Sequence, residues 1–470
     1  MATYKTPGVY IEEVPQIVLS IADIATAIPA FIGYTQITNR QGSIMTPVRI
    51  TSLFEYTAVF GTAANTEFTV EITDVVDNGI VISRETSSSV SADPHDTMYY
   101  HMQMYFANGG GPCYILSLGS AAGTKAAADY STGLAVIALE DEPTLLVFPD
   151  AVQALTATEI YDLYDTALLQ CASLKDRFVI MDCHGNDAGT LRDGTTGIGN
   201  NNLKYGAAYH PYLLTTLNYN YTDNTIKVQH NYRNTLGEDL GNALYTINNI
   251  PNYVLGNVLI DKNNVYQISR QEANKHRITL NPSAAIAGVY VATDNTRGVW
   301  KAPANVSLSN VNGVTKFISE SEQSGLNIDP VAGKSVNAIR AFVGKGTMVW
   351  GARTLAGNDG EWRYVSVRRL FNVVEESIKK TIESFVFESN DAGTWIKIKS
   401  LVNNFLTTLW RAGAMQGSSE EEAFYVAVGL HETMSATDIL EGRLVVEIGL
   451  AAVRPAEFIV IRFSHTMAES

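Results

Sequence analysis

The residues of this chain that most resemble catalytic groups form the run Asp182-Cys183-His184-Gly185. The run follows Arg177–Met181, an apolar stretch with the composition of a buried strand. Open α/β sheets bind ligands and place active sites at the carboxyl ends of their strands, so an acid beside a histidine here is the pattern of a hydrolase. Hydrolysis by a triad also needs a serine that the histidine can deprotonate, and the run contains none. The run therefore contains the acid and the histidine of a hydrolase triad but not its nucleophile.

Two glycine-lysine pairs and the histidines are the remaining candidates for cofactor or metal binding. Gly333-Lys334-Ser335 resembles the end of a phosphate-binding loop, but that loop needs a glycine at the position of Ile328. Gly344-Lys345-Gly346-Thr347 also lacks the full pattern, and both segments are predicted to be turns. The eight histidines, His95 and His101 among them, show no metal-ligand spacing and are expected in surface or core roles. We predict no metal and no cofactor.

Basic residues in the last third of the chain stand out because the net charge is −15. Each one by itself is typical of a solvated helix face. Together they offer a local positive surface for an acidic partner. The group consists of Arg368, Arg369, Lys379, Lys380, Lys397 and Lys399. We slightly favour Lys397 and Lys399 over Lys379 and Lys380 as contacts.

The composition is that of a well-buried globular protein. The chain has 470 residues, 46% hydrophobic and 17% charged, which predicts two or three domains. Its negative charge argues against broad binding of nucleic acid or anionic membranes. The start of the chain has no secretory apolar run, and no stretch reaches the ~18 apolar residues of a membrane helix. Cys113, Cys171 and Cys183 are odd in number and lie in or beside apolar segments, so they are expected to be reduced thiols of a protein that folds in the cytoplasm.

Strands and helices alternate through the middle of the chain. Apolar strands separated by helices indicate an α/β layer with a largely parallel sheet. The predicted strands are Ala27–Tyr34, Cys113–Leu118, Leu145–Phe148 and Arg177–Met181, continued by Tyr205–Thr215 and Ala284–Ala292, and the predicted helices are Thr97–Ala107 and Thr158–Cys171.

Two insertions interrupt this alternation. Residues 36–95 carry short strand-like pieces, which predicts a small β-rich insertion. Residues 218–270 are rich in Asn and Tyr, with a turn signal at Asp261–Asn264 and alternating strands around it. This second segment is predicted to be a β-hairpin insertion on the surface.

The C-terminal part changes to helices, and both ends of the chain have the character of arms. Apolar stripes predict helices over Ser366–Phe387 and Trp395–Trp410, followed by strands Arg443–Leu450 and Glu457–Phe463. The first ~25 residues contain one short strand fenced by prolines. An extended arm of ~15 residues reaches roughly 50 Å. Because its backbone groups are unpaired, an arm either folds back on its own domain or adds to the sheet edge of a neighbouring copy.

Long stretches in the second half of the chain resemble contractile tail sheath proteins, and they occur in the family's order. The opening TPGVYIEE (Thr6–Glu13) is similar to the family's N-terminus as well. The other stretches are NPSAAIAGVYVATDNTRGVWKAPAN (Asn281–Asn305), GTMVWGARTL (Gly346–Leu355), EWRYVSVRRLFNVVEESI (Glu361–Ile378) and GRLVVEIGLAAVRPAEFIVIRF (Gly442–Phe463).

The resemblance implies an α/β fold, α+β overall, in four parts. These are an N-terminal exchange arm (1–25), a subtilisin-like α/β domain (26–355) with β insertions at about 36–95 and 218–270, a C-terminal α+β sheath domain (356–452) and a C-terminal exchange arm (453–470). In this family the terminal strands are exchanged between neighbours, and the C-terminal domain faces the inner tube. The implied exchange residues are Val9, Tyr10, Ile11, Phe458, Ile459, Val460 and Ile461, and the implied tube contacts are the four lysines named above.

The implied function is structural and not enzymatic. Copies would stack in rings as a homo-oligomeric helical sleeve around an inner tube protein, with baseplate and terminal cap proteins as further partners. Contraction would drive the tube through a target cell envelope, without nucleic-acid binding or direct membrane insertion. The protein would assemble in the host cytoplasm and end in a virion tail or a released contractile particle.

Other functions remain open on the sequence alone. A phage tail, a tailocin and an injection system are not distinguished by one chain. A degenerate or active subtilisin-like hydrolase is the alternative from another class. In this chain, however, His184 lacks the usual histidine-glycine-threonine-histidine context, and Gly194-Thr195-Thr196 has threonine where the nucleophilic serine would be. A carbohydrate-binding surface protein would rest only on the Asn/Tyr-rich insertion.

Overall fold

The computed structural model describes residues 21, 24–38, 45–91, 97–254 and 258–458. The expected exchange residues Val9, Tyr10 and Ile11 lie outside the described residues, as do Ile459, Val460 and Ile461. The described chain divides into two compact units. The larger unit holds Ala25–Val373 together with residues 454–458, and the smaller unit holds Val374–Val453.

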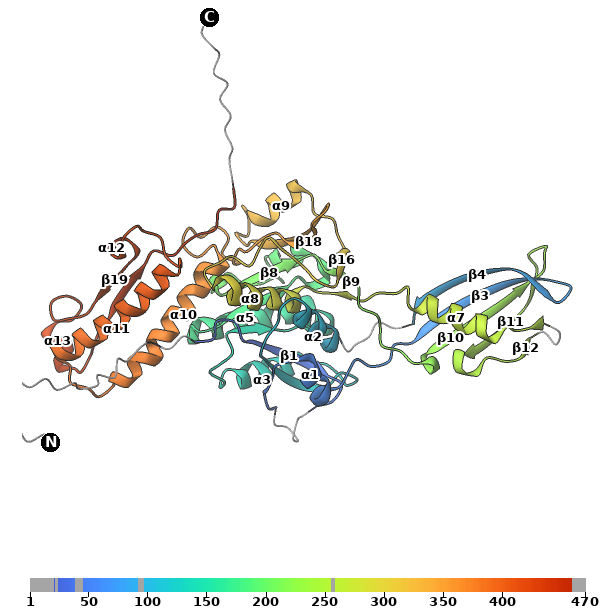
Figure 1. Cartoon of the computed structure of the whole chain (residues 1–470), viewed down its shortest axis with the longest axis horizontal. Helices are drawn as coiled ribbons and strands as arrows, with labels where there is room; N and C mark the ends of the chain where they lie inside the picture. Colours follow the sequence, from blue (N-terminus) through green and yellow to red (C-terminus); the bar gives the residue numbers. More distant parts are fainter. Residues whose placement is uncertain (1–20, 22–23, 39–44, 92–96, 255–257, 459–470) are drawn as a thin grey trace, which may run out of the picture. The chain divides into compact units, whose positions relative to one another are not determined.

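A nine-stranded sheet is the centre of the larger unit (Figure 1). Its strand order is β15-β18-β17-β8-β7-β6-β1-β5-β2, and the six strands from β17 to β5 run parallel. Three further pairs are antiparallel: β2 with β5, β18 with β17, and β15 with β18. The bounds are β1 Pro29–Thr35, β2 Val48–Ile50, β5 Cys113–Ser120, β6 Leu145–Val147, β7 Phe178–Asp182, β8 Gly206–His210, β15 Val306–Ser307, β17 Val336–Phe342 and β18 Gly346–Val349. The largely parallel α/β sheet predicted from the sequence is thus confirmed.

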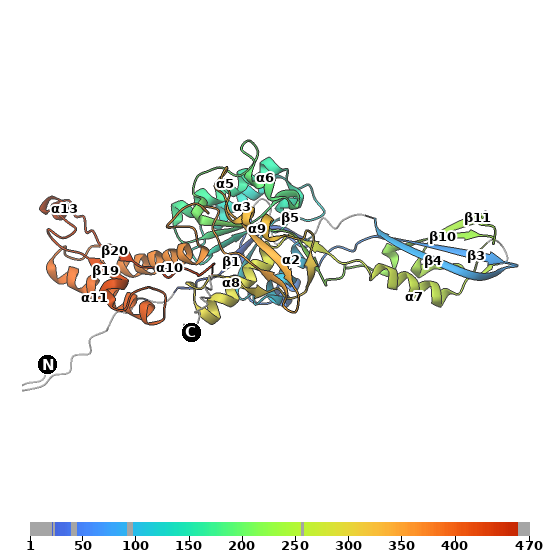
Figure 2. The ribbon, with the colours of Figure 1, turned by 90° about the horizontal axis from the view of Figure 1, so that it is seen from above.

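Helices cover both faces of this sheet, because each strand sends alternate side chains to opposite faces. In β7, Val179 and Met181 join the core under one helix layer, whereas Phe178 and Ile180 join the other core. Figure 2 shows the two layers on either side of the strands. The first layer contains α3 (Ala127–Ile137), α4 (Ala151–Ala154), α5 (Ala157–Leu174), α6 (Ala188–Arg192) and α9 (Glu320–Asn327), and the second contains α1 (Leu53–Phe60), α2 (Met98–Ala107) and α8 (Ser283–Arg297).

Two segments that were expected to continue the sheet have other structures. Ala284–Ala292, predicted as a strand, lies inside α8 and is buried along its whole length apart from partly exposed Ala292. A short apolar run does not distinguish a buried strand from a buried helix, and tertiary burial decided for the helix. Tyr205–Thr215 is split, because β8 belongs to the main sheet and β9 pairs elsewhere. The second, three-stranded sheet has the order β14-β9-β16, with bounds Thr279–Leu280, Leu213–Thr215 and Val311–Val314.

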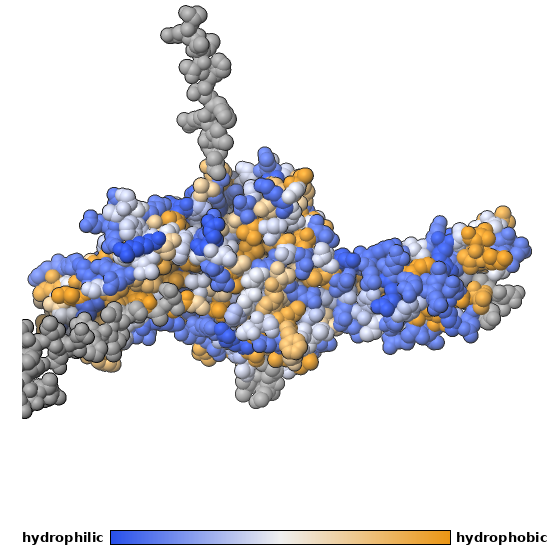
Figure 3. Space-filling model, viewed as in Figure 1, coloured by the Kyte–Doolittle hydropathy of each residue, from blue (hydrophilic) through white to orange (hydrophobic). Residues whose placement is uncertain are grey.

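Parts of the two predicted insertions form one structure with its own core. The expectation for residues 36–95 is wrong in its bounds, because β2 belongs to the main sheet and α1 packs on it. Strand β10 (Ile226–Arg233) of the second insertion pairs in parallel with β3 (Phe68–Asp77) of the first along eight residues. The resulting sheet has the order β11-β10-β3-β4, where β4 is Ile80–Val90 and β11 is Asp239–Thr246. Helix α7 (Lys262–Ala273) packs on one face, and the short pair β12 (Tyr253–Val254) and β13 (Val258–Leu259) lies beside it in sequence. We call this part the insertion module. In Figure 3 its surface is mainly hydrophilic, with hydrophobic atoms gathered near one end.

Helix α7 was not expected from the sequence. The turn signal at Asp261–Asn264 marks instead the beginning of the helix, since the Asp261 side chain accepts a hydrogen bond from the Asn264 backbone N–H at 3.1 Å. Asp favours turns and helix N-caps for the same reason, namely that its carboxylate accepts from a nearby backbone N–H.

Two long helices and a small sheet make up most of the C-terminal part. Helix α10 (Val365–Ile382) begins in the larger unit and ends in the smaller one. The predicted helices and the last described strand are confirmed, although β20 is shorter than expected. The remaining elements are α11 (Ala392–Arg411), α12 (Glu420–Ala423), β19 (Phe424–Ala427), α13 (Ala436–Leu440) and β20 (Glu447–Leu450). None of the helices in the described ranges is both long and apolar enough to span a membrane.

Candidate functional site

The carboxylate of Asp182, at the end of β7, has a fixed set of partners. It is 0% exposed. One oxygen accepts from the Ser283 backbone N–H at 2.9 Å, and the other accepts from the Asn281 side-chain amide at 2.5 Å. Burial raises the pKa of Asp182 to about 7, against the opposing effect of these hydrogen bonds. The contacts tie the end of β7 to the first turn of α8, which is a structural use of the carboxylate.

The other residues of the hydrolase pattern have different partners. The His184 ring nitrogen Nε2 lies 3.2 Å from the Leu155 carbonyl. The Thr196 hydroxyl and backbone N–H donate to the Asp193 carboxylate at 3.0 and 2.7 Å. The structure therefore does not bring Asp182, His184 and Thr196 into one hydrogen-bonded set. The hydrolase alternative gains no support from this geometry.

The prediction of turns holds for only part of the two glycine-lysine segments, because Gly333–Ser335 is irregular chain before β17 and Gly346 and Thr347 begin β18. Lys334 is 3% exposed, and its ammonium donates to the Ile198 carbonyl, so the side chain is used in packing. Gly344 and Lys345 form the hairpin turn between β17 and β18. His95 lies outside the described residues, and His101 is buried in α2, where burial lowers its pKa to about 3.

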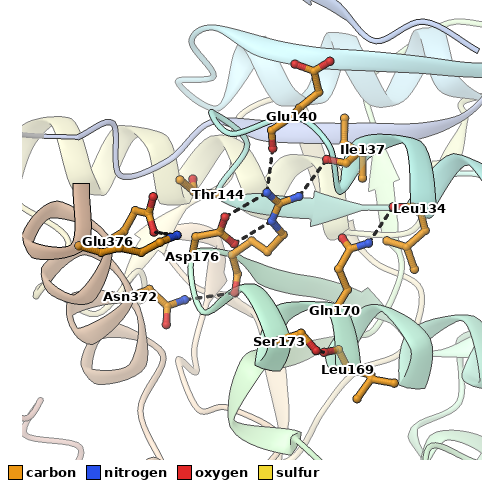
Figure 4. Close-up of polar contacts among 12 residues, drawn as sticks. Leu134, Ile137, Glu140, Thr144, Leu169, Gln170, Ser173, Asp176, Asn372 and Glu376 are labelled. Carbon is orange, nitrogen blue, oxygen red and sulfur yellow. Dashed lines mark hydrogen bonds and ion pairs between the residues drawn. The ribbon is translucent and has the colours of Figure 1, made fainter. Parts of the chain in front are cut away.

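Arg177 holds the first half of α10 within the larger unit through partners that are labelled in Figure 4, namely Ile137, Glu140, Asp176 and Asn372. Its buried guanidinium donates to the carbonyls of Ile137 and Glu140 at 3.0 and 2.9 Å, where α3 ends. Helix ends leave such carbonyls without intrahelical partners. The Asp176 carboxylate lies 2.8 Å away, and the Arg177 carbonyl accepts from the Asn372 side chain of α10 at 3.1 Å.

Two of the six basic residues proposed as a positive surface are buried, so the expectation is wrong for them. Arg368 and Arg369 are 2% and 3% exposed. Arg369 pairs with Asp294 at 2.6 Å, and the guanidinium of Arg368 lies over the Trp362 ring at 4.4 Å from its centroid. Both anchor α10 to the larger unit and present no charge to a partner.

The four lysines remain on the surface, with different surroundings. Lys379 and Lys380 both pair with Glu376 of α10, at 3.5 and 3.3 Å. Lys399 pairs with an exposed glutamate at 3.2 Å. Lys397 is exposed on α11, and no ion pair is recorded for it in the described part of the chain. Lys379 and Lys397 are both exposed, and of the two Lys379 pairs with a carboxylate.

The small sheet of the smaller unit is the candidate acceptor for exchanged strands. Strands β19 and β20 pair antiparallel from Phe424↔Leu450 to Ala427↔Glu447. The buried side chains Phe424 and Val426 face the side of α11. Within the described residues the sheet contains only these two strands. A two-stranded sheet is marginal in water, and additional strands would stabilise it.

Sequence reasoning missed an ion pair between a buried arginine and a glutamate close to the C-terminal arm. The Arg353 guanidinium is 2% exposed and binds the Glu457 carboxylate through several hydrogen bonds. Phe458 follows, 71% exposed and outside any described strand. Both partners lie in stretches quoted above, GARTL and RPAEF, but their separation of about a hundred positions gives no local signal.

The chain is similar to known proteins in sequence as well as in fold. A family model, the phage tail sheath C-terminal domain, matches residues 358–466. The tail sheath protein of Vibrio phage KVP40 is 23% identical over 213 residues, 45% of this chain, and that of Enterobacteria phage T4 is 29% identical over 150 residues, 32% of this chain. These matches span only 30% and 22% of the respective relatives.

Solved structures match over nearly the whole chain. One chain of the anti-feeding prophage baseplate is 30% identical, with a TM-score of 0.65, covering 99% of this chain and 100% of its own. The sheath complex of the extracellular contractile injection system PVC in the contracted state gives 28% identity and a TM-score of 0.65, covering 99% and 98%. The contracted helical sheath of the anti-feeding prophage gives 28% and 0.66, covering 98% and 99%.

Proposed function

Since the chain belongs to the contractile tail sheath family, we propose that it is the repeating protomer of a sheath that polymerises around an inner tube. Contraction of the sheath drives the tube through a target cell envelope. The observation that carries this proposal is the end-to-end similarity to chains of contracted injection-system sheaths, at 28% identity and TM-scores of 0.65 and 0.66. A similarity that covers both units supports the function of a complete sheath protomer better than a match to the C-terminal domain alone does.

Strand exchange links neighbouring protomers in this proposal. The N-terminal strand around Val9–Ile11 and the C-terminal strand from Phe458 onward add to the β19–β20 sheet of neighbours. The two-stranded state of that sheet in the described residues supports the idea. Because added strands bond through backbone groups, the link survives while the bodies of the protomers rotate past one another.

The remaining parts of the proposal concern fold detail, partners and location. The nine-stranded α/β layer corresponds to a subtilisin-like domain that has kept the fold and not the chemistry. The smaller unit faces the inner tube, and baseplate and terminal cap proteins close the ends of the sleeve. Protomers assemble in the host cytoplasm and end in a virion tail or a released contractile particle.

Polymer formation tests the proposal. Purified protein is expected to form tubes or stacked rings in negative-stain electron microscopy, because exchanged arms make heterologous contacts that propagate. Deleting Met1–Pro15 is expected to leave folded monomers. The matched control replaces the same residues by a Gly/Ser segment of equal length, which is also expected to stay monomeric. Normal tubes from both variants would exclude arm exchange, and a monomeric wild-type protein at all concentrations would exclude the sheath function.

A further inference from the structure

The larger unit contains a preformed binding site for one carboxylate, built around Arg353. The Arg353 backbone N–H donates to the Asn337 side-chain oxygen at 2.7 Å, and its carbonyl accepts from the Asn337 amide at 2.8 Å. Asn337 is 0% exposed in β17. The guanidinium Nη1 donates to the Asn327 carbonyl, at the end of α9, at 3.0 Å. Backbone and side chain are therefore both held by elements of the larger unit.

Glu457 occupies this site. Its carboxylate accepts from Arg353 Nε at 2.9 Å and from Nη2 at 2.5 Å, which is the bidentate geometry of a strong arginine–carboxylate pair. The Tyr364 hydroxyl donates to the same carboxylate at 3.2 Å. The Glu457 side chain is 21% exposed, so solvent screens the pair only partly.

Glu457 lies where the chain returns from the smaller unit to the larger one. Residues 454–458 belong to the larger unit, although the preceding residues Val374–Val453 form the smaller one. Glu457 comes directly before the apolar residues expected to form the exchange strand. Two residues of extended chain span only ~7 Å, so binding of Glu457 confines the start of that strand to a small volume on the larger unit.

We propose that Arg353 is a positioning residue for strand exchange: by binding Glu457 it fixes where the C-terminal strand leaves the larger unit, ready to add to a second copy of the chain. The inference rests on the proposed function, because it assigns a role within polymerisation. An arm whose start is fixed loses less conformational freedom when it pairs, and its effective concentration at the acceptor sheet is higher. A free arm would bind the same sheet more weakly and in more than one register.

Glu457→Gln tests the proposal, because it keeps the shape of the side chain and removes the charge. The matched control is Glu67→Gln, which removes the carboxylate of an exposed ion pair with Lys227 at 2.6 Å. Near-UV circular dichroism checks that both variants fold. In Glu457→Gln monomers, chymotrypsin is expected to cut after the exposed Phe458 about tenfold faster than in wild type, because cleavage requires the segment to detach from Arg353. Polymer yield in sedimentation is expected to fall by a similar factor, whereas Glu67→Gln changes neither quantity.

A second variant weakens the binding of Glu457 by a smaller amount. Tyr364→Phe removes one donor to Glu457 and leaves Arg353 in place, so the rate of cleavage after Phe458 is expected to rise only about two- to threefold. An unchanged cleavage rate after Phe458 in Glu457→Gln would overturn the proposal, and so would faster cleavage with normal polymer yield. If the wild-type protein forms no polymer, the sheath function fails, and the cleavage rate still decides whether Arg353 holds residues 454–458.

Discussion

At the scale of single residues, Asp182 shows how a catalytic-looking group serves folding. Its carboxylate is buried and satisfied by the backbone and side chain of the α8 start. Its pKa of about 7 in the folded protein lies above the ordinary value of ~3.9 for an unfolded chain. Between about pH 4 and about pH 7, the folded state therefore holds a proton that the unfolded state has released. This contribution to stability is fully present below about pH 4 and is lost as the pH rises to about 7.

Asp182→Asn is expected to remove this pH dependence. Between pH 5 and pH 8 the wild-type protein is expected to lose roughly 3 kcal/mol of unfolding free energy that the variant keeps, because each of the two pH units between pH 5 and the folded pKa corresponds to ~1.4 kcal/mol. Urea unfolding of both proteins at the two pH values measures the difference. Asp77→Asn, at an exposed position, is the control. Parallel pH profiles for wild type and Asp182→Asn would contradict the raised pKa.

Lys397 is the residue on which the basic contact with the tube is best tested. Reversal of Lys379 or Lys380 would add a carboxylate beside Glu376, which is 6% exposed, and would disturb α10 itself. Lys397→Glu avoids this problem because the side chain is exposed. We expect fewer tube-filled sheaths, most clearly at low salt, since exposed pairs contribute only ~0.2–1 kcal/mol each and are screened.

Tube occupancy counted in negative-stain images measures this effect. Lys262→Glu makes the same charge change on exposed α7 and is expected to leave occupancy unchanged. Equal occupancy for Lys397→Glu, Lys399→Gln and wild type at every salt concentration would leave apolar or backbone contacts as the attachment.

At the scale of elements, the insertion module must be kept or removed as a whole. Removing residues 220–267 alone would cut α7 and uncover Phe68, Val70 and Ile72 of β3, which are 0% exposed. Such a variant is expected to aggregate, because an apolar face and a sheet edge are opened together. Removing residues 68–90 and 218–277 together is expected to leave a folded protein that still polymerises.

The ends for this double deletion are already close. The Ser91 N–H bonds to the Glu67 carbonyl at 2.9 Å, and the Ile278 N–H bonds to the Leu217 carbonyl at 3.2 Å, so short Gly/Ser linkers can join each pair. Solubility, circular dichroism and electron microscopy of the single and double deletions provide the test. A double deletion that fails to fold would show that the module supports the main sheet.

The C-terminal strand can be tested by the parity of its backbone donors. In a strand, alternate N–H groups point to opposite edges, so proline removes a ladder bond only at positions of one parity. Of the two variants Ile459→Pro and Val460→Pro, one is therefore expected to prevent polymerisation and the other is not. Neither is expected to change the melting temperature of the monomer. A clear fall in monomer melting temperature would mean instead that the strand pairs within its own chain.

At the scale of the whole molecule, the net charge of −15 acts on assembly. Packed copies repel one another, and salt weakens this repulsion, since the screening length is ~10 Å at 0.1 M and ~3 Å at 1 M. Polymerisation of the sheath protein alone is expected to increase with salt. Co-assembly with a tube through lysines is expected to decrease with salt. Sedimentation of the sheath protein alone, and of the sheath protein with a tube, across a NaCl series separates the two effects. If polymerisation and co-assembly respond to salt in the same direction, one of the two effects is excluded.

The sequence alone determined the family and the local elements. Long apolar runs between helical stripes predicted the parallel α/β layer, because strand and helix periodicities are written in neighbouring residues. The stretches Asn281–Asn305 and Gly442–Phe463 carried the resemblance that the comparisons confirmed. The sequence also indicated that Gly333–Ser335 is not a phosphate-binding loop, since Ile328 stands where that loop needs glycine.

Only the tertiary structure decided which distant segments meet. The pairing of β3 with β10 joins residues more than 150 positions apart, and each insertion looked like an independent surface feature until the other was beside it. The α8 segment Ala284–Ala292 is a helix because it packs on the sheet, which no local pattern expresses. Arg368 and Arg369 looked like surface charges, but Trp362 and Asp294 bury them. The contact of Arg353 with Glu457 depends on where the chain returns after the smaller unit, and that return is a property of three-dimensional packing.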